Sequence, residues 1–190
     1  MSMNIKKQRT KNINKGFTLV ETLVAISLLT ISIVAPMSLT MLALSSAIYA
    51  RDQITAYYLA QEGIEAVRSV RDGNILVTAL GTPTPILSEG TGPGQIPSTS
   101  GTPFTIDTHT IPATMALCDS GTCRVLETDG DLYGYSSGWT NTTFTRSVSA
   151  TVISQDEVRI SVTVSWNTSP FNVRSFTLSD NLYAWINTGI

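Results

Sequence analysis

The sequence predicts an α+β fold in which one long N-terminal helix packs on a small antiparallel sheet. Two patterns predict it: an uncharged apolar run that continues into an amphipathic helical pattern, and a C-terminal half rich in short alternating segments. The chain has 190 residues, which leaves room for one globular domain beyond the apolar run, because domains commonly occupy about 100 to 150 residues.

The first part of the predicted helix, residues 17–50, is long enough to span a membrane. From Thr22 to Ala50, 29 consecutive residues carry no charge, and at about 1.5 Å of rise per residue they exceed a hydrocarbon core about 30 Å thick. A secretory signal peptide cut near Ser45-Ser46-Ala47 is disfavoured, because its apolar region would run for only about 7 to 15 residues.

Basic residues before this segment predict its orientation. The first sixteen residues carry no acid and five basic side chains, which are Lys6, Lys7, Arg9, Lys11 and Lys15. Because Lys and Arg favour the cytoplasmic side, we expect a single-pass protein of the cytoplasmic (inner) membrane, with residues 1–16 inside and the domain outside.

The helix is predicted to continue as an amphipathic segment over residues 51–73. Its apolar side chains recur at spacings of three and four residues: Tyr57, Ala60, Ile64, Val67 and Val70. Gly63 in the middle of this pattern predicts close packing against another element. Gly73 predicts the end of the helix, since glycine is the preferred residue for a left-handed C-terminal cap.

Pro36 lies inside the apolar run and predicts a kink or local melting of the helix, because proline removes a backbone hydrogen bond. A weakened segment could let the helix extend as the protein leaves the bilayer. Alternatively, the proline is simply tolerated in lipid.

Residues 74–103 are predicted to form a connecting loop, and residues 104–190 an antiparallel sheet domain. Five prolines and five glycines between positions 81 and 103 cannot continue a helix. Apolar and polar residues then alternate, most clearly over 157–166, which predicts a strand with one buried face. Further strands are predicted over 144–153 and 171–178, with a hairpin at Ser154-Gln155-Asp156.

The junction before the apolar run reads Lys-Gly-Phe-Thr-Leu-Val-Glu over residues 15–21. Gly16 suits a cleavage point, because a residue without a side chain can enter a peptidase cleft as extended backbone. Glu21 is the only acid in the first 51 residues. An ionised carboxylate at the bilayer midplane costs about 2.5 kcal/mol or more, so Glu21 needs a partner, although the helix dipole also favours an acid in the first turn.

This junction resembles the cleavage and methylation motif of type IV prepilins and type II secretion pseudopilins. The resemblance implies that a prepilin peptidase/N-methyltransferase cuts after Gly16, removes the leader 1–16 and methylates Phe17. It also implies that Glu21 pairs with the N-terminal amine of a neighbouring subunit. The implied partners are other pilin or pseudopilin subunits, the inner-membrane assembly platform and membrane lipid.

The segment Tyr57-Tyr58-Leu59-Ala60-Gln61-Glu62-Gly63-Ile64-Glu65 resembles the helix of minor pilins and minor pseudopilins. Its pattern equally fits any amphipathic helix that lies on a sheet.

Charge and motif content disfavour two other functional classes. Beyond residue 16, seven basic side chains stand against fourteen acidic ones, a formal charge of −7, which disfavours general nucleic-acid binding. The string from Gly134 to Gly138 matches a hydrolase nucleophile elbow, but the single histidine, His109, precedes it and no helical pattern follows. We therefore expect no enzyme and no cofactor.

Cys118 and Cys123 enclose a short turn and are predicted to form a disulfide in an oxidising compartment. Two cysteines and one histidine are a poor ligand set for zinc. Asp129 and Asp131 could offer oxygen ligands to calcium, but an Asp-Gly turn between strands is the commoner arrangement, and their spacing does not match a twelve-residue calcium loop.

The sequence thus favours a non-enzymatic minor pilin or pseudopilin, a membrane-anchored subunit of a filament. The alternative is a membrane-tethered extracytoplasmic adhesin or ligand-binding module that does not join a filament. The sequence leaves open whether the system is a pilus, a secretion machine or a DNA-uptake machine.

Overall fold

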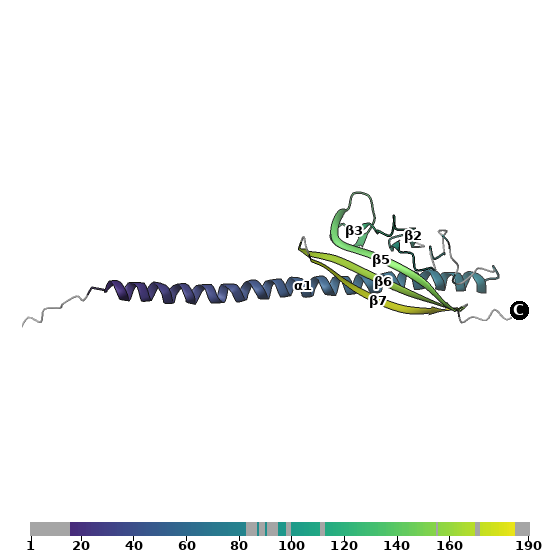
Figure 1. Cartoon of the computed structure of the whole chain (residues 1–190). Coiled ribbons are helices and arrows are strands. Elements are labelled where there is room, and N and C mark those ends of the chain that lie inside the picture. The colour runs from purple at the N-terminus through teal and green to yellow at the C-terminus, as the bar shows by residue number, and fades with distance from the viewer. Residues whose placement is uncertain are drawn as a thin grey trace, which may run out of the picture. The chain divides into compact units, whose positions relative to one another are not determined.

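The computed structural model describes residues 16–82, 87, 90, 95–97, 100–110, 113–154, 156–169 and 172–184. Contacts divide the chain into two compact units, Met1–Ala47 and Ile48–Ile190. Helix α1, Leu19–Ala79, begins in the first unit and ends in the second, which also holds every described strand (Figure 1).

Within the second unit, α1 is amphipathic as predicted. Its buried residues recur at helical spacing: Ala56, Leu59, Ala60, Gly63, Ile64, Val67, Val70 and Asn74. Tyr57, predicted on this face, is instead 41% exposed and lies at its margin, with its ring centroid 5.7 Å from that of Phe176. The amphipathic pattern is confirmed, except that Tyr57 lies at the edge of the buried face and Ala56 and Leu59 lie within it.

The helix ends later than the sequence predicts. Gly73 is an ordinary helical residue, and α1 continues to Ala79 because the next residue, Asn74, is 7% exposed and belongs to the buried face. The left-handed cap is Gly81, with φ of 94°. Its N–H donates to the carbonyl of Thr78 at 3.0 Å, and the N–H of Thr82 donates to that of Val77 at 3.2 Å, which is the Schellman arrangement.

Among the described residues, seven strands form one antiparallel sheet, and this confirms the predicted fold class. They are β1 (Phe104–Asp107), β2 (Thr114–Leu117), β3 (Val125–Thr128), β4 (Tyr133–Gly134), β5 (Thr140–Ser154), β6 (Glu157–Ser169) and β7 (Asn172–Tyr183). The three long strands pair in the order β5, β6, β7 alongside α1, while β1 and β3 also pair with β5 (Figure 1).

The predicted hairpin between β5 and β6 is present, with Ser154 paired to Glu157. Strand β7 extends to Tyr183, beyond the predicted end at Leu178, because its pairing with β6 continues to that point. Phe171, the predicted first residue of this strand, lies outside the described residues.

Along β6, apolar residues alternate with polar ones, and the apolar side chains face the core as predicted. The inward residues Val158, Ile160, Val162, Val164 and Trp166 are each at most 2% exposed. Gly63 lets α1 approach this layer, because a Cβ at that position would lie 3.1 Å from Cγ1 of Val162. The close packing expected at Gly63 is confirmed.

One inward position of β5 carries a charge. Arg146 is fully buried, and the next inward-facing residues on the strand are Phe144 and Val148. Its guanidinium donates to the carbonyls of Leu59 at 3.2 Å and Ile106 at 2.8 Å, and to the carboxylate of Glu62 at 3.1 Å. The side chain therefore ties α1 and β1 to β5.

Candidate functional site

Helix α1 starts at a capped N-terminus. The Thr18 hydroxyl accepts the backbone N–H of Glu21 at 3.3 Å, and the Thr18 carbonyl accepts that of Thr22 at 3.1 Å, so Thr18 is the N-cap. Sequence reasoning missed this role, although Thr-x-x-Glu before an apolar run is the signature of a capping box. The cap fixes where the helix begins and places Glu21 in its first turn.

The predicted cleavage junction lies immediately before this cap. Gly16, Phe17 and Thr18 are not helical, and the Phe17 side chain is 80% exposed. No atom lies within 4 Å of the position that a Cβ on Gly16 would take. The Gly16–Phe17 peptide bond is therefore accessible in this unit. The basic leader, residues 1–15, lies outside the described residues.

Glu21 lies in the first turn of α1, four residues after Phe17, and is exposed. Among the residues that the structure describes, no cation forms an ion pair with it. The capping bond uses its backbone N–H, which leaves both carboxylate oxygens available to a group outside the chain.

The first half of α1 presents apolar side chains on every side. All residues from Leu19 to Ala50 are exposed, and by length and composition this stretch can cross a membrane. Several of its hydroxyls bond within the helix: Thr22, Ser27 and Thr30 donate to the carbonyls three residues before them, each at 2.8 Å. These hydrogen bonds suit a hydrocarbon surrounding, where water does not pair polar groups.

Helix α1 continues through Pro36. The Thr40 hydroxyl donates to the Pro36 carbonyl at 2.8 Å, and the Ser38 hydroxyl donates to that of Ala35 at 2.9 Å. These bonds support the backbone just after the proline, and the predicted kink stays a prediction.

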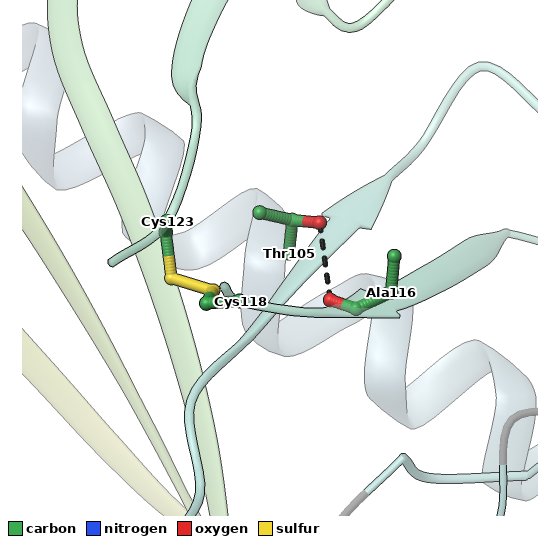
Figure 2. The surroundings of a disulfide bond; sticks show 4 residues. All are labelled: Thr105, Ala116, Cys118 and Cys123. Atoms are coloured by element: carbon green, nitrogen blue, oxygen red, sulfur yellow. Dashed lines mark hydrogen bonds between the residues drawn. A yellow bond between two sulfur atoms is a disulfide. The ribbon is translucent and has the colours of Figure 1, made fainter. Parts of the chain in front are cut away.

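Cys118 and Cys123 are joined by a disulfide, with their Cα atoms 4.6 Å apart (Figure 2). The turn between them has two consecutive left-handed residues, Ser120 with φ of 49° and Gly121 with φ of 80°. This is the type I′ geometry favoured in tight hairpins. The bridge connects the end of β2 to the start of β3, in the unit that does not contain the cleavage junction.

The acidic turn at Asp129 is closed by its own carboxylate. Oδ1 of Asp129 accepts the backbone N–H groups of Leu132 at 2.9 Å and Asp131 at 3.0 Å. These two hydrogen bonds lower the pKa of Asp129 below its usual value. Within the described part of the chain, no group of three or more His, Cys, Asp or Glu side chains could hold a metal ion.

The segment from Gly134 to Gly138, whose sequence matches a hydrolase nucleophile elbow, does not have the structure of one. Ser136 and Ser137 lie in a turn before β5, and no helix follows them. Nε2 of His109 lies 3.0 Å from the carbonyl of Tyr133, where the missing Cβ of Gly134 leaves room for the imidazole ring.

Comparison with known proteins identifies the N-terminal region. Residues 11–35 match the family model described as the prokaryotic N-terminal methylation motif, which is the signature of type IV pilins and pseudopilins. No curated protein and no solved structure matches the chain. The motif, together with the long apolar helix, suggests a membrane-anchored protein.

Proposed function

We propose that this chain, which carries the methylation motif of type IV pilins and pseudopilins, is a minor pilin or pseudopilin: a non-enzymatic subunit of a pilus-like filament. The match over residues 11–35 carries this proposal, because it covers the junction and the start of the apolar helix together. The inside-positive leader and the exposed apolar span support the same topology, with the domain outside the cytoplasm.

In this proposal, prepilin peptidase hydrolyses the Gly16–Phe17 bond at the cytoplasmic face. Hydrolysis by water leaves a carboxylate on Gly16 and a free amine on Phe17. The amine then takes the methyl group of an activated methyl donor and releases one proton. The exposure of Phe17 and the non-helical backbone from Gly16 to Thr18 support access by the peptidase.

The methylated amine and Glu21 then serve assembly. A carboxylate near the membrane core is costly unless an opposite charge compensates it. Glu21 has no such partner among the described residues, and the Phe17 amine of a neighbouring subunit would supply one. Pairing of these two groups would set the axial register between adjacent helices.

The exposed apolar side chains of Leu19–Ala50 require cover outside this chain. In the membrane, lipid covers them, and in a filament the corresponding helices of other subunits would do so. The same surface would thus serve as anchor first and as filament core later. An assembly platform in the inner membrane would transfer the subunit from one state to the other.

Filament incorporation tests this proposal. Replacing Glu21 with Ala should leave the protein in the membrane at normal levels but strongly reduce its amount in sheared filaments, measured by immunoblot of both fractions. Thr30→Ala is the matched control, because the Thr30 hydroxyl bonds only to the Ser27 carbonyl of its own helix in the structure. Normal incorporation of the Glu21→Ala variant would contradict the assembly role of Glu21, and absence of the wild-type protein from sheared filaments would favour the alternative, a tethered adhesin or ligand-binding module.

A further inference from the structure

An aromatic and cationic cluster lies where the apolar run of α1 ends. Tyr49 is the last residue but one of the run, and Arg51 is the first charged residue after it. The centroid of the Tyr49 ring lies 6.5 Å from that of Trp166 on β6. On β7, the Arg174 guanidinium lies 5.6 Å from the centroid of the same Tyr49 ring. The first residues of β7 are therefore neighbours of the end of the apolar run, within the second compact unit.

The length of the apolar run sets the depth of this cluster in a bilayer. The inference rests on the topology of the proposed function, in which the run crosses the membrane. From Thr22 to Ala50 the helix extends for about 44 Å, at about 1.5 Å per residue. A bilayer with its headgroup layers is about 40 to 45 Å thick. With Thr22 at the cytoplasmic face, Tyr49 and the Arg174 guanidinium beside it lie among the headgroups of the opposite leaflet.

The cluster exposes side chains that suit the headgroup layer. Tyrosine is enriched at this level of membranes, since its ring is apolar and its hydroxyl is polar. Among large apolar residues of the described strands, Val173 is the most exposed, at 71%. Arg174 is exposed too, and in the part of the chain that the structure describes it forms no ion pair. An apolar side chain thus adjoins a cation that has no carboxylate partner.

The local charge favours an anionic surface. Residues 49–52 and 172–175 together carry two arginines, Arg51 and Arg174, and one acid, Asp52. The Arg51 side chain is 78% exposed, and its contact with Asp52 is long, at 3.4 Å. Attraction between Arg174 and the Tyr49 ring depends on the charge of the guanidinium and uses none of its N–H hydrogen bonds. The donors of both arginines can therefore serve a ligand.

We propose that Arg174 and Arg51 bind the phosphate groups of anionic phospholipids in the leaflet on the domain side, with Val173 inserted between the headgroups. Guanidinium groups form paired hydrogen bonds to phosphate oxygens, and their weak hydration suits a partly dehydrated layer. The domain then contacts the bilayer directly, in addition to its connection through α1. This contact would fix the orientation of the domain on the membrane before the subunit leaves it.

Fluorescence quenching in lipid nanodiscs tests this contact on the full chain. Both native cysteines are joined in the disulfide, so one introduced cysteine can carry a bimane label. Val173→Cys reports the proposed contact. Ile153→Cys is the matched control, an exposed position at the other end of the sheet, beside the hairpin of β5 and β6. The discs contain phosphatidylcholine alone or mixed with phosphatidylglycerol, and a lipid with a spin-labelled headgroup is the quencher.

Fluorescence lifetimes give the ratio of quenched to unquenched label. In discs with phosphatidylglycerol, this ratio should be high at position 173 and low at position 153. Arg174→Gln should lower the ratio at position 173 roughly fivefold, the effect of one basic residue near an anionic surface. Omission of phosphatidylglycerol should lower it at least as much. Arg174 is exposed, so the variant should still fold.

Arg159→Gln is the matched charge control. Arg159 is exposed on β6 and pairs with Asn181, seven residues along β7 from Arg174. That separation is about 24 Å, more than twice the Debye length of about 10 Å in 0.1 M salt. The ratio at position 173 should therefore stay within about twofold of the wild type.

Three results would each overturn the proposed contact: equal quenching at positions 173 and 153, an unchanged ratio in Arg174→Gln, or an unchanged ratio without phosphatidylglycerol. A label at Met37→Cys, with the spin label moved to the acyl chains, tests the topology separately. Quenching there is expected, because Met37 lies near the middle of the apolar run. Its absence would overturn both the contact and the topology, whereas quenching there with any of the three results overturns the contact alone.

Discussion

Arg146 joins three parts of the folded unit through one side chain. Its guanidinium bonds to α1 at Leu59 and Glu62, and to β1 at Ile106, while its own strand is β5. Glu62 in turn accepts a hydrogen bond from the Thr108 hydroxyl. A carboxylate and two carbonyls accept from the two terminal nitrogens of this fully buried cation, while its Nε has no hydrogen-bond partner among the described residues.

Replacing Arg146 with Met should destabilise the folded unit by roughly 3 kcal/mol, because the Glu62 carboxylate and two buried carbonyls lose their donor. Thermal unfolding by near-ultraviolet circular dichroism should show a midpoint lowered by about 10 °C. The control is Arg159→Met on the exposed face of β6, where a change within about 0.5 kcal/mol is expected. Equal midpoints for the Arg146 variant and the wild type would contradict this role.

A short local motif can be located from the sequence, whereas contacts between distant residues cannot. The processing and assembly roles of Gly16, Phe17 and Glu21 stay predictions. Gly16, Phe17 and Glu21 belong to one short motif, and the structure places them together at the start of α1. Arg146 depends on partners 84 and 87 positions away in the chain, which no local pattern reveals. The contact of Arg174 with the Tyr49 ring likewise appears only once the chain is folded.

The end of helix α1 depends on two opposing factors, a glycine in the local sequence that favours a stop and the burial of the residues that follow it. Gly73 is a local stop signal, but Asn74 is buried on the inner face of α1, and its carbonyl accepts the Thr78 hydroxyl at 2.9 Å. Packing therefore carries the helix to Ala79, and Gly81 supplies the left-handed residue. The strands were easier to predict, because alternation on β6 directly encodes one buried and one exposed face.

Two alanine substitutions test the observed end of the helix. Gly73→Ala should stabilise the folded unit by up to about 1 kcal/mol, since Gly73 is helical and no atom lies within 4 Å of an added Cβ. Gly81→Ala should destabilise it by about 1 kcal/mol, because φ of 94° disfavours a side chain. Thermal unfolding of both variants gives the comparison. The opposite signs would show that the helix ends at Gly73.

The chain has an apolar segment, Leu19–Ala50, whose side chains are exposed, and a domain whose apolar side chains form a buried core. The formal charge of the full sequence is −2, and removal of residues 1–16 would change it to −7, with seven basic and fourteen acidic side chains left. All five leader charges that favour retention on the cytoplasmic side would leave with the cut peptide. Cleavage would thus free the N-terminus to follow the apolar helix into a filament.

Mass spectrometry of the N-terminal peptide, from protein purified out of the native membrane, tests the central claim most directly. A chain processed as a pilin must begin at Phe17 and carry one methyl group on its amine. Recovery of that peptide is the predicted result. A chain that still begins at Met1, or one that begins near Ile48 after secretory cleavage, would contradict the proposed function.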